Sequence, residues 1–308
     1  MKTVLVAAEA ESGSWAEKLR AAMPGRPVLT SRSSEDAAVP YAVVDHPPTG
    51  LLRSLPGLEV VLSLNAGVEH LLARGEVPHG VPIVRMADDG MREGMIEWVT
   101  AQVLAWHRNL FAYRTAQTQG RWAPQMERLA RERTVAVLGA GALGAPVASM
   151  LAAFGFETRI WSRSRREVPG VTAFAGSSEF AAALQGADIL VSVLPLTAQT
   201  EDLLGAAAFA RLSRGAFVVN AGRGRCLVDR DLIAALDAGV LGGAALDVFR
   251  EEPLPADHPF WRHPGVVVSP HVAAPTQPLT AVAAIAESIR RHERGEPLLH
   301  VVDRTLGY

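Results

Sequence analysis

The sequence has few features that would suggest disulfides, a large charged partner or a membrane. A single cysteine, Cys226, stands among 308 residues, so no disulfide can form within the chain, which fits a reducing compartment. The 30 basic and 32 acidic side chains give a net charge of -2, too little to attract nucleic acid or an anionic membrane. We therefore expect a small-molecule partner, with no nucleic acid and no membrane.

Long hydrophobic runs are also missing. The apolar run at residues 3–8 ends at Glu9 and is too short for the core of a signal peptide. Residues 136–156 carry no charge, but they contain Pro146 and several glycines, which predicts a strand, a turn and a helix rather than a membrane span. We expect a cytoplasmic protein.

The pattern of apolar residues predicts an α/β protein. The length favours two domains. Short β-branched runs alternate with helical ones in the first third, and a second series of the same kind begins at Thr134. Between them, apolar residues spaced three and four apart over residues 92–119 predict one amphipathic helix. The fold class predicted is two Rossmann-like, doubly wound domains with parallel sheets.

A glycine-rich turn gives the first functional signal. The stretch VLGAGALG places Gly139, Gly141 and Gly144 in G-x-G-x-x-G spacing, after a predicted strand and at the start of a predicted helix. The first glycine permits a tight turn, the second lets the backbone approach a pyrophosphate, and the third lets helix and strand pack closely. The turn predicts dinucleotide binding. The alternative is a tight turn that only connects a strand to a helix.

The end of the next predicted strand indicates which dinucleotide is bound. NAD sites usually place an acidic residue there, about 20 residues after the turn, to hold the ribose hydroxyls. This chain has IWSRSRRE instead, with Ser162, Arg163, Ser164, Arg165 and Arg166. Guanidinium groups and hydroxyls suit a 2'-phosphate, so we expect NADPH, with NADH weaker. The alternative is a solvated basic loop.

The carboxyl ends of the remaining strands carry candidate catalytic residues. In an open parallel sheet, ligands bind beyond these ends. Arg223 follows VVNAG, and its guanidinium could grip the carboxylate and carbonyl of a keto acid together. His271 follows VVVSP and could donate a proton while the nicotinamide donates hydride. A histidine is largely neutral at about pH 7, so a neighbouring carboxylate is needed to favour the protonated ring. Glu251 or Glu252 could supply it.

Other interpretations of these residues are weaker. His258, His263 and His271 are spaced unlike helical metal ligands, and no cysteine pair is available, so we expect no metal. Ser269 and Cys226 lack a strained nucleophile turn, which argues against acyl transfer. Taken singly, Arg223 could be a surface ion pair, Glu252 a solvated acid and His271 a core ring.

Taken together, these motifs resemble those of a known family. The sequences LNAGVEH, GAGALG, WSRSR, LPLTAQT, NAGRG, ALDVF with EEPLP, SPHVAA and the ending VDRTLGY are distributed over nearly the whole chain. They resemble the D-isomer-specific 2-hydroxyacid dehydrogenases, and within them the glyoxylate/hydroxypyruvate reductase A branch.

The resemblance implies an arrangement of domains and roles for residues. It implies two domains with a cleft between them, and we place a substrate-binding domain at 1–97 and 281–308 and a dinucleotide-binding domain at 98–280. Arg223 would bind substrate, His271 would be the acid/base, and Glu252 would be the partner of His271. Backbone N–H groups of Ala66, Gly67 and Val68 would hold the substrate carboxylate. The expected cofactor-binding residues are Gly139, Gly141, Ala142, Leu143, Gly144, Ser162, Arg163, Ser164, Arg165, Leu194, Pro195, Thr200, Ala221, Gly222, Asp247 and His271.

The resulting hypothesis is an NADPH-preferring reductase of glyoxylate and hydroxypyruvate. The resemblance also implies a homodimer joined through the helix at 92–119 and the loop after it, with Trp122 reaching the neighbouring subunit. Two alternatives remain. One is a broader 2-keto acid reductase acting on pyruvate or bulkier acids, and the other is a non-catalytic scaffold of the same fold that senses the dinucleotide.

Overall fold

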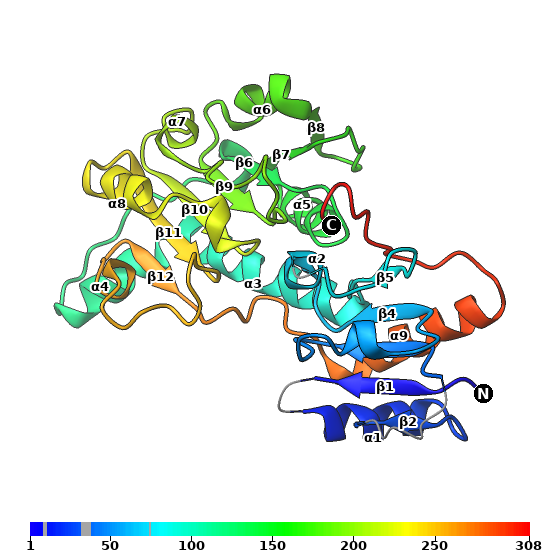
Figure 1. The fold of residues 1–308 in the computed structure, drawn as a ribbon. Coiled ribbons are helices and arrows are strands. Elements are labelled where there is room, and N and C mark those ends of the chain that lie inside the picture. The colour runs from blue at the N-terminus through cyan, green and yellow to red at the C-terminus, as the bar shows by residue number, and fades with distance from the viewer. Residues whose placement is uncertain (9–10, 32–37, 74) are drawn as a thin grey trace. The chain divides into compact units, whose positions relative to one another are not determined.

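The chain divides into two compact units. The structure, a computed structural model, describes residues 1–8, 11–31, 38–73 and 75–308 (Figure 1). The first unit comprises Met1–Met91 together with Thr276–Tyr308, and the second comprises Arg92–Pro275. Each unit is built around one parallel sheet.

The first unit has a five-stranded sheet in the order β2-β1-β3-β4-β5, with every pair parallel. Its strands are β1 (Val4–Ala7), β2 (Val28–Leu29), β3 (Tyr41–Val44), β4 (Val60–Ser63) and β5 (Ile83–Val84). Its helices are α1 (Ser12–Ala22), α2 (Glu69–Ala73) and α9 (Pro278–Glu293), with a 3₁₀ turn, η1 (Leu52–Ser54).

The central strands of this sheet are buried on both faces, because helices cover the sheet. Every residue of β3 and β4 is buried, as expected for apolar runs in a parallel sheet. Near the end of the chain α9 packs against α1 and buries an apolar face of Ala281, Val282, Ile285, Ala286 and Ile289. Residues from both ends of the sequence therefore share one unit.

The second unit has a seven-stranded parallel sheet in the order β12-β11-β10-β9-β6-β7-β8. Its strands are β6 (Thr134–Leu138), β7 (Glu157–Ser162), β8 (Thr172–Ala175), β9 (Ile189–Ser192), β10 (Ala216–Asn220), β11 (Leu241–Leu246) and β12 (Val266–Val268). Its helices are α4 (Leu110–Thr118), α5 (Gly144–Ala153), α6 (Gly176–Leu184), α7 (Ala206–Phe209) and α8 (Asp229–Asp237), with 3₁₀ turns η2 (Ala130–Glu132), η3 (Gly224–Cys226) and η4 (Pro259–Trp261). One more helix, α3 (Asp89–His107), crosses from the first unit into the second.

Alternate residues of the second sheet face two separate apolar cores. Ala136 and Leu138 of β6 belong to one core, and Val135 and Val137 belong to the other. Strand β6 pairs with β9 on one side and β7 on the other, so the strand order reverses here. This reversal is the usual binding position of a dinucleotide in such a sheet.

The two parallel sheets confirm the predicted fold class, but one predicted helix is wrong. Residues 92–119 form parts of two helices, α3 and α4, because Asn109 between them adopts a left-handed φ of 55°. Asparagine adopts this conformation more readily than most residues, and the helical periodicity continues across it. The unit boundaries fall after Met91, within the first turn of α3, and after Pro275, whereas the boundaries predicted from the sequence are after residues 97 and 280.

Aromatic residues of this helical segment pack inside the second unit. Trp106 stacks on Phe217 of β10 with ring centroids 5.4 Å apart, and Phe111 lies 6.0 Å from the same ring. None of the helices in the described ranges is both long and apolar enough to span a membrane.

Candidate active site

The glycine-rich turn has the geometry needed for a pyrophosphate. Gly139 follows β6 with a φ of 110°, which side-chain-bearing residues rarely adopt. A Cβ on Gly144 would lie 1.8 Å from the carbonyl oxygen of Gly139, so only glycine lets α5 begin here. A Cβ on Gly141 would meet no atom within 4 Å, so the backbone there has open space beside it. Together with Ala142 and Leu143, this turn places the start of α5 where a phosphate would bind, so the residues fit a dinucleotide.

The basic residues after β7 do not all have the same surroundings. Arg165 donates two hydrogen bonds to the carboxylate of Glu179, at 2.7 and 2.6 Å, and one to the carbonyl of Ala173 at 2.5 Å. Ser162 donates to the carbonyl of Ser164, which shapes the loop between them. Arg165 therefore braces the loop on which exposed Arg163 lies. The pairing with Glu179 was not apparent from the sequence, since 14 residues separate the two.

The turns after β9 and β10 pack tightly on each other. A Cβ on Gly222 would lie 2.6 Å from both the backbone nitrogen and oxygen of Leu194. Thr200 is 8% exposed and donates to the carbonyl of Pro195 at 2.6 Å, so its hydroxyl stabilises the turn that follows β9. The two turns thus form one surface at the strand ends, which contains Leu194, Pro195, Thr200, Ala221 and Gly222.

The loops carrying Arg223 and Glu252 touch through their backbones. A Cβ on Gly224 would lie 1.9 Å from the carbonyl carbon of Phe249, which leaves no room for a side chain. Arg250 joins the same loops, because its guanidinium donates to Asp202 at 2.5 Å and to the carbonyl of Leu227 at 2.9 Å. Sequence reasoning missed Gly224, Phe249 and Arg250, since their contacts connect different strand ends.

His271 and Glu252 form a hydrogen-bonded pair. Nδ1 of His271 lies 2.7 Å from Oε2 of Glu252, while Oε1 of Glu252 accepts from the backbone N–H of Phe249 at 2.9 Å. Half of the His271 side chain is exposed, so the ring can be reached from solvent. Since Nδ1 faces the carboxylate, Nε2 is the atom that can exchange a proton with a ligand.

Asp247 fixes the turn that carries His271. Its carboxylate, 1% exposed, accepts hydrogen bonds from Ser269 Oγ at 2.6 Å and from the backbone N–H groups of Val272 and Ala273 at 2.9 and 2.8 Å. His271 itself adopts a φ of 55°, and its N–H donates to the carbonyl of Asp247 at 2.8 Å. The turn therefore holds the ring at the end of β11.

The pair is electrostatically favourable. Burial raises the pKa of Glu252, but hydrogen bonds from His271 and Phe249 and the charges of His271 and Arg223 outweigh it and leave the pKa below its usual range. Glu252 is therefore a carboxylate at neutral pH. Its contribution to folding stability is present above the usual carboxyl range and is lost as the pH falls through the lowered pKa.

Arg223 lies at the start of η3, where its backbone is extended. Its Nη1 donates to the carbonyl of Gly222 at 2.7 Å. Because its charge acts on Glu252, the guanidinium and the His271–Glu252 pair share one end of the second sheet. An arginine fork, a proton donor and a phosphate turn at the ends of parallel strands can bind an anionic carbonyl compound beside a dinucleotide.

The predicted carboxylate-binding residues lie in the first unit. Ala66, Gly67 and Val68 connect β4 to α2, and Thr276 donates to the carbonyl of Leu64 just before them. Val68 is buried, whereas Ala66 and Gly67 are half-buried. Their backbone is thus at a strand end, at the carboxyl edge of the first sheet.

Comparison with known proteins identifies the family. Residues 100–273 match the model of the D-isomer specific 2-hydroxyacid dehydrogenase, NAD binding domain. The chain belongs to this family. The dehydrogenase is 42% identical over 299 residues to a protein of Klebsiella pneumoniae (strain 342) named glyoxylate/hydroxypyruvate reductase A, a match that covers 96% of each chain.

Two solved structures resemble this dehydrogenase over its full length. One is a D-isomer specific 2-hydroxyacid dehydrogenase from Xanthobacter autotrophicus Py2 in complex with NADPH and MES, with a TM-score of 0.95, 39% identity and coverage of 100% and 99% of the two chains. The other is an NADPH-dependent glyoxylate/hydroxypyruvate reductase from Sinorhizobium meliloti in complex with NADP and sulfate. It has a TM-score of 0.92, 38% identity and coverage of 100% of both chains.

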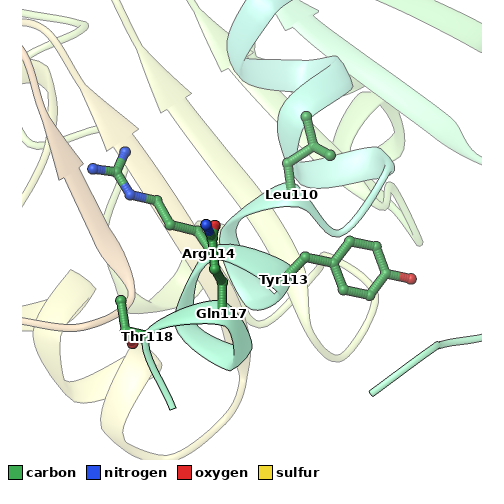
Figure 2. A pocket seen from close by; sticks show the side chains of 5 residues that line it. All are labelled: Leu110, Tyr113, Arg114, Gln117 and Thr118. Atoms are coloured by element: carbon green, nitrogen blue, oxygen red, sulfur yellow. The ribbon is translucent and has the colours of Figure 1, made fainter. Parts of the chain in front are cut away.

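The dehydrogenase also has a hollow of about 760 Å³ along α4. Its lining consists of Leu110, Tyr113, Arg114, Gln117 and Thr118 (Figure 2). All five side chains come from one helix, so no strand ends or catalytic groups converge there. This hollow is an open helix surface and not part of the candidate active site.

Proposed function

We propose that this dehydrogenase is an NADPH-preferring reductase that converts glyoxylate to glycolate and hydroxypyruvate to D-glycerate. The observation that carries the proposal is the His271–Glu252 pair, at 2.7 Å, in the same strand-end surface as Arg223 and the glycine turn. The name of the Klebsiella pneumoniae relative supports the choice of substrates.

The residues of the chain divide the chemistry between them. A bound dinucleotide would supply hydride to the carbonyl carbon. Arg223 binds the carboxylate and carbonyl oxygens of the keto acid through its planar fork and polarises the carbonyl. Nε2 of His271 donates a proton to the carbonyl oxygen, and Glu252 stabilises the positive charge that the ring carries before the transfer.

Residues in the other loops bind and orient the two ligands. We assign the substrate carboxylate to the backbone N–H groups of Ala66, Gly67 and Val68. Asp247 is assigned to the nicotinamide end, where its carboxylate already fixes the His271 turn. We assign the part of the cofactor between its two ends to two turns, one with Leu194, Pro195 and Thr200 and the other with Ala221 and Gly222.

The preference for NADPH rests on the loop after β7, which has Ser162, Arg163, Ser164 and Arg165 in place of a carboxylate. A 2'-phosphate accepts hydrogen bonds from guanidinium groups, whereas a carboxylate would repel it. The neighbour from Xanthobacter autotrophicus, crystallised with NADPH, supports this assignment.

Replacing Arg163 and Arg165 together by alanine should raise KM for NADPH by about 10- to 100-fold, because charge-assisted bonds to the 2'-phosphate are lost. KM for NADH should change little, since it lacks that phosphate. Steady-state kinetics with both cofactors would measure the difference. The matched control removes two exposed arginines elsewhere in the second unit, Arg211 and Arg230. Equal increases for NADPH and NADH would instead indicate a solvated loop.

Replacing Glu252 by glutamine should lower kcat/KM for keto acid reduction by about tenfold or more, because the amide has no charge to stabilise the positive charge on the His271 ring. In the wild type kcat/KM should also fall at acidic pH, where the carboxylate of Glu252, with its lowered pKa, takes up a proton. The variant should lack this fall, because an amide does not titrate. The measurement is kcat/KM from about pH 3.5 to 8 for both proteins, a range that includes the usual carboxyl pKa. The prediction fails if both profiles show the same fall at acidic pH.

The substrate and cofactor assignments are tested together by one panel of reactions. NADPH and NADH are each combined with glyoxylate, hydroxypyruvate, pyruvate and phenylpyruvate, and the absorbance of the reduced nicotinamide is followed. We expect the highest kcat/KM with NADPH and glyoxylate or hydroxypyruvate. A higher value with pyruvate or phenylpyruvate would identify a broader 2-keto acid reductase, and no reaction with any of them would identify a dinucleotide-sensing scaffold.

We further propose a homodimer in the cytoplasm. Exposed apolar side chains at and after α4 support the dimer: Leu110 is 54%, Trp122 96% and Met126 97% exposed. Light scattering after gel filtration should give about twice the chain mass of 32.8 kDa, and replacing Trp122 and Met126 by serine should lower it. A monomer at all concentrations would contradict this. The single cysteine fits the reducing cytoplasm, which cell fractionation would test.

A further inference from the structure

The loop that carries Glu252, residues 249–254, is held mainly by side chains. The backbone of residues 250–254 forms no hydrogen bond with the backbone of any other residue that the structure describes. Residues 250–253 are exposed, between buried Phe249 and half-buried Leu254. Within this Glu252 loop, the carboxylate of Glu252 accepts from the N–H of Phe249. The position of that carboxylate therefore depends on side-chain contacts of an exposed stretch of chain.

Arg250 connects the Glu252 loop to two other segments of the second unit. Its Nη1 donates to Oδ1 of Asp202 at 2.5 Å and to the carbonyl of Leu227 at 2.9 Å. Asp202 lies between β9 and α7, and Leu227 directly follows η3, the turn that begins after Arg223. One guanidinium therefore joins the loop of the catalytic acid to the turn of the substrate-binding arginine.

The two segments that Arg250 binds are fixed to each other by their backbones. The N–H of Asp202 donates to the carbonyl of Arg225 at 2.9 Å. The backbone of Leu204 donates to Cys226 at 2.9 Å and accepts from the N–H of residue 228 at 3.0 Å. Asp202 itself adopts a left-handed φ of 55°, which aspartate tolerates better than most residues. Arg250 is therefore anchored to a hydrogen-bonded framework.

Arg250 and Glu252 have different charged neighbours. The hydrogen bond to Asp202 raises the pKa of Arg250, and the charges of nearby acids add to the increase, against the effect of burial. These acids are Asp202, Asp229 and Glu201. Burial raises the pKa of Glu252, whereas its hydrogen bonds and the charges of His271 and Arg223 lower it. We therefore expect Arg250 to act on Glu252 through the position of the loop more than through its charge.

We propose that Arg250 is a positioning residue for the reduction of keto acids, which holds the Glu252 loop against the turn after Arg223. The inference rests on the proposed function, because it requires Glu252 and Arg223 to act on one substrate. The backbones of the two loops already touch, since a Cβ on Gly224 would lie 1.9 Å from the carbonyl carbon of Phe249. A shift of the Glu252 loop would therefore displace the turn of Arg223 as well. Arg250 acts through these two residues and not on the ligand.

Loss of the Arg250 guanidinium should have two effects on the pair of Glu252 and His271. The loop would lose its bonds to the two other segments, which would weaken the bonds of Glu252 to His271 and to the N–H of Phe249. A more distant carboxylate stabilises the charged His271 ring less, which lowers kcat. The same two bonds lower the pKa of Glu252 against burial, so their weakening should raise that pKa. The fall of kcat/KM at acidic pH should then move to higher pH.

The test uses Arg250→Met in the full-length protein, because methionine keeps an apolar stem and removes the guanidinium. We expect kcat for glyoxylate reduction with NADPH to fall by about tenfold or more, as a misplaced catalytic group causes. The fall of kcat/KM at acidic pH, measured from about pH 3.5 to 8, should move to higher pH. Kd for NADPH, measured by tryptophan fluorescence, should change little, because the glycine turn is untouched. Arg250→Lys keeps a charged donor and should recover part of the lost kcat.

The neighbouring ion pair provides a matched control. Nη2 of Arg225 lies 2.5 Å from Oε1 of Glu201, the residue directly before Asp202. Both arginines therefore pair with an acid of the same segment at the same distance, but only Arg250 belongs to the Glu252 loop. Arg225→Met should keep the wild-type kcat and the wild-type pH profile.

The outcomes separate this inference from the proposed function. Equal losses of kcat in Arg250→Met and Arg225→Met, or an acidic fall of kcat/KM that Arg250→Met does not move, overturn the role of Arg250. Reduction of glyoxylate by the wild type would still support the proposed function. If Arg250→Met does not fold, Asp202→Asn, which tolerates the left-handed backbone, is compared with Glu201→Gln, and kcat must be lower in the asparagine variant. A wild type that does not reduce glyoxylate overturns both proposals.

Discussion

Replacing His271 by alanine should lower kcat for reduction of glyoxylate by about 10²- to 10⁴-fold, the usual contribution of a positioned acid. The ring is held by three features: its left-handed backbone, its N–H bond to Asp247 and the 2.7 Å contact with Glu252. These leave Nε2 as the ring nitrogen that can exchange a proton with a ligand. Alanine removes the donor, so water must protonate the carbonyl oxygen.

The lower kcat of His271→Ala is expected to result from loss of the proton donor and not from unfolding of the protein. His271 is half exposed and its side chain bonds to Glu252, so the variant should remain folded and bind NADPH as the wild type does. Tryptophan fluorescence with bound NADPH measures both. His79→Ala, which removes an exposed histidine of the first unit, is the control and should keep the wild-type kcat. A His271→Ala kcat within threefold of the wild type would exclude the proton-donor role.

Replacing Arg223 by lysine should lower kcat/KM for glyoxylate by about 10- to 100-fold. An ammonium group keeps the positive charge but cannot form two parallel bonds to the carboxylate and carbonyl oxygens. Loss of one charge-assisted hydrogen bond corresponds to about 1.5–3 kcal/mol, which gives this range.

The structure provides a closely matched control two residues away. Arg225 lies in the same turn, pairs with Glu201 at the surface and is 53% exposed. Arg225→Lys makes the same chemical change without touching the proposed substrate position and should leave kcat/KM close to that of the wild type. Equal effects of the two substitutions would mean that the turn is sensitive to any change, and that Arg223 has no special part in binding.

The sequence predicts the fold and the strand-end surfaces because both depend on local patterns. Alternating strands and helices predict parallel sheets, and glycine spacing predicts the turn after β6, where the structure shows the required φ at Gly139. Since parallel strands end at the same edge, Arg223 and His271 could be assigned to one surface. Position relative to the neighbouring proline, known from the resemblance, was needed to choose Glu252 over Glu251.

The features that the sequence did not reveal depend on contacts between distant segments or on single dihedral angles. Asn109 separates α3 from α4 through a left-handed backbone that leaves the helical spacing unchanged. The backbone contact of Gly224 with Phe249 joins the ends of two strands. The pairing of Arg165 with Glu179 and the stacking of His46 on His70 likewise require the folded chain. No motif encodes these contacts.

The most direct test of the account is to follow both products of one reaction of the wild-type protein. The purified chain is mixed with NADPH and hydroxypyruvate, NADPH oxidation is followed by absorbance, and glycerate is separated on a chiral column. We expect one D-glycerate for each NADPH oxidised and no L-glycerate. Binding of NADPH without oxidation, or formation of L-glycerate, would contradict it.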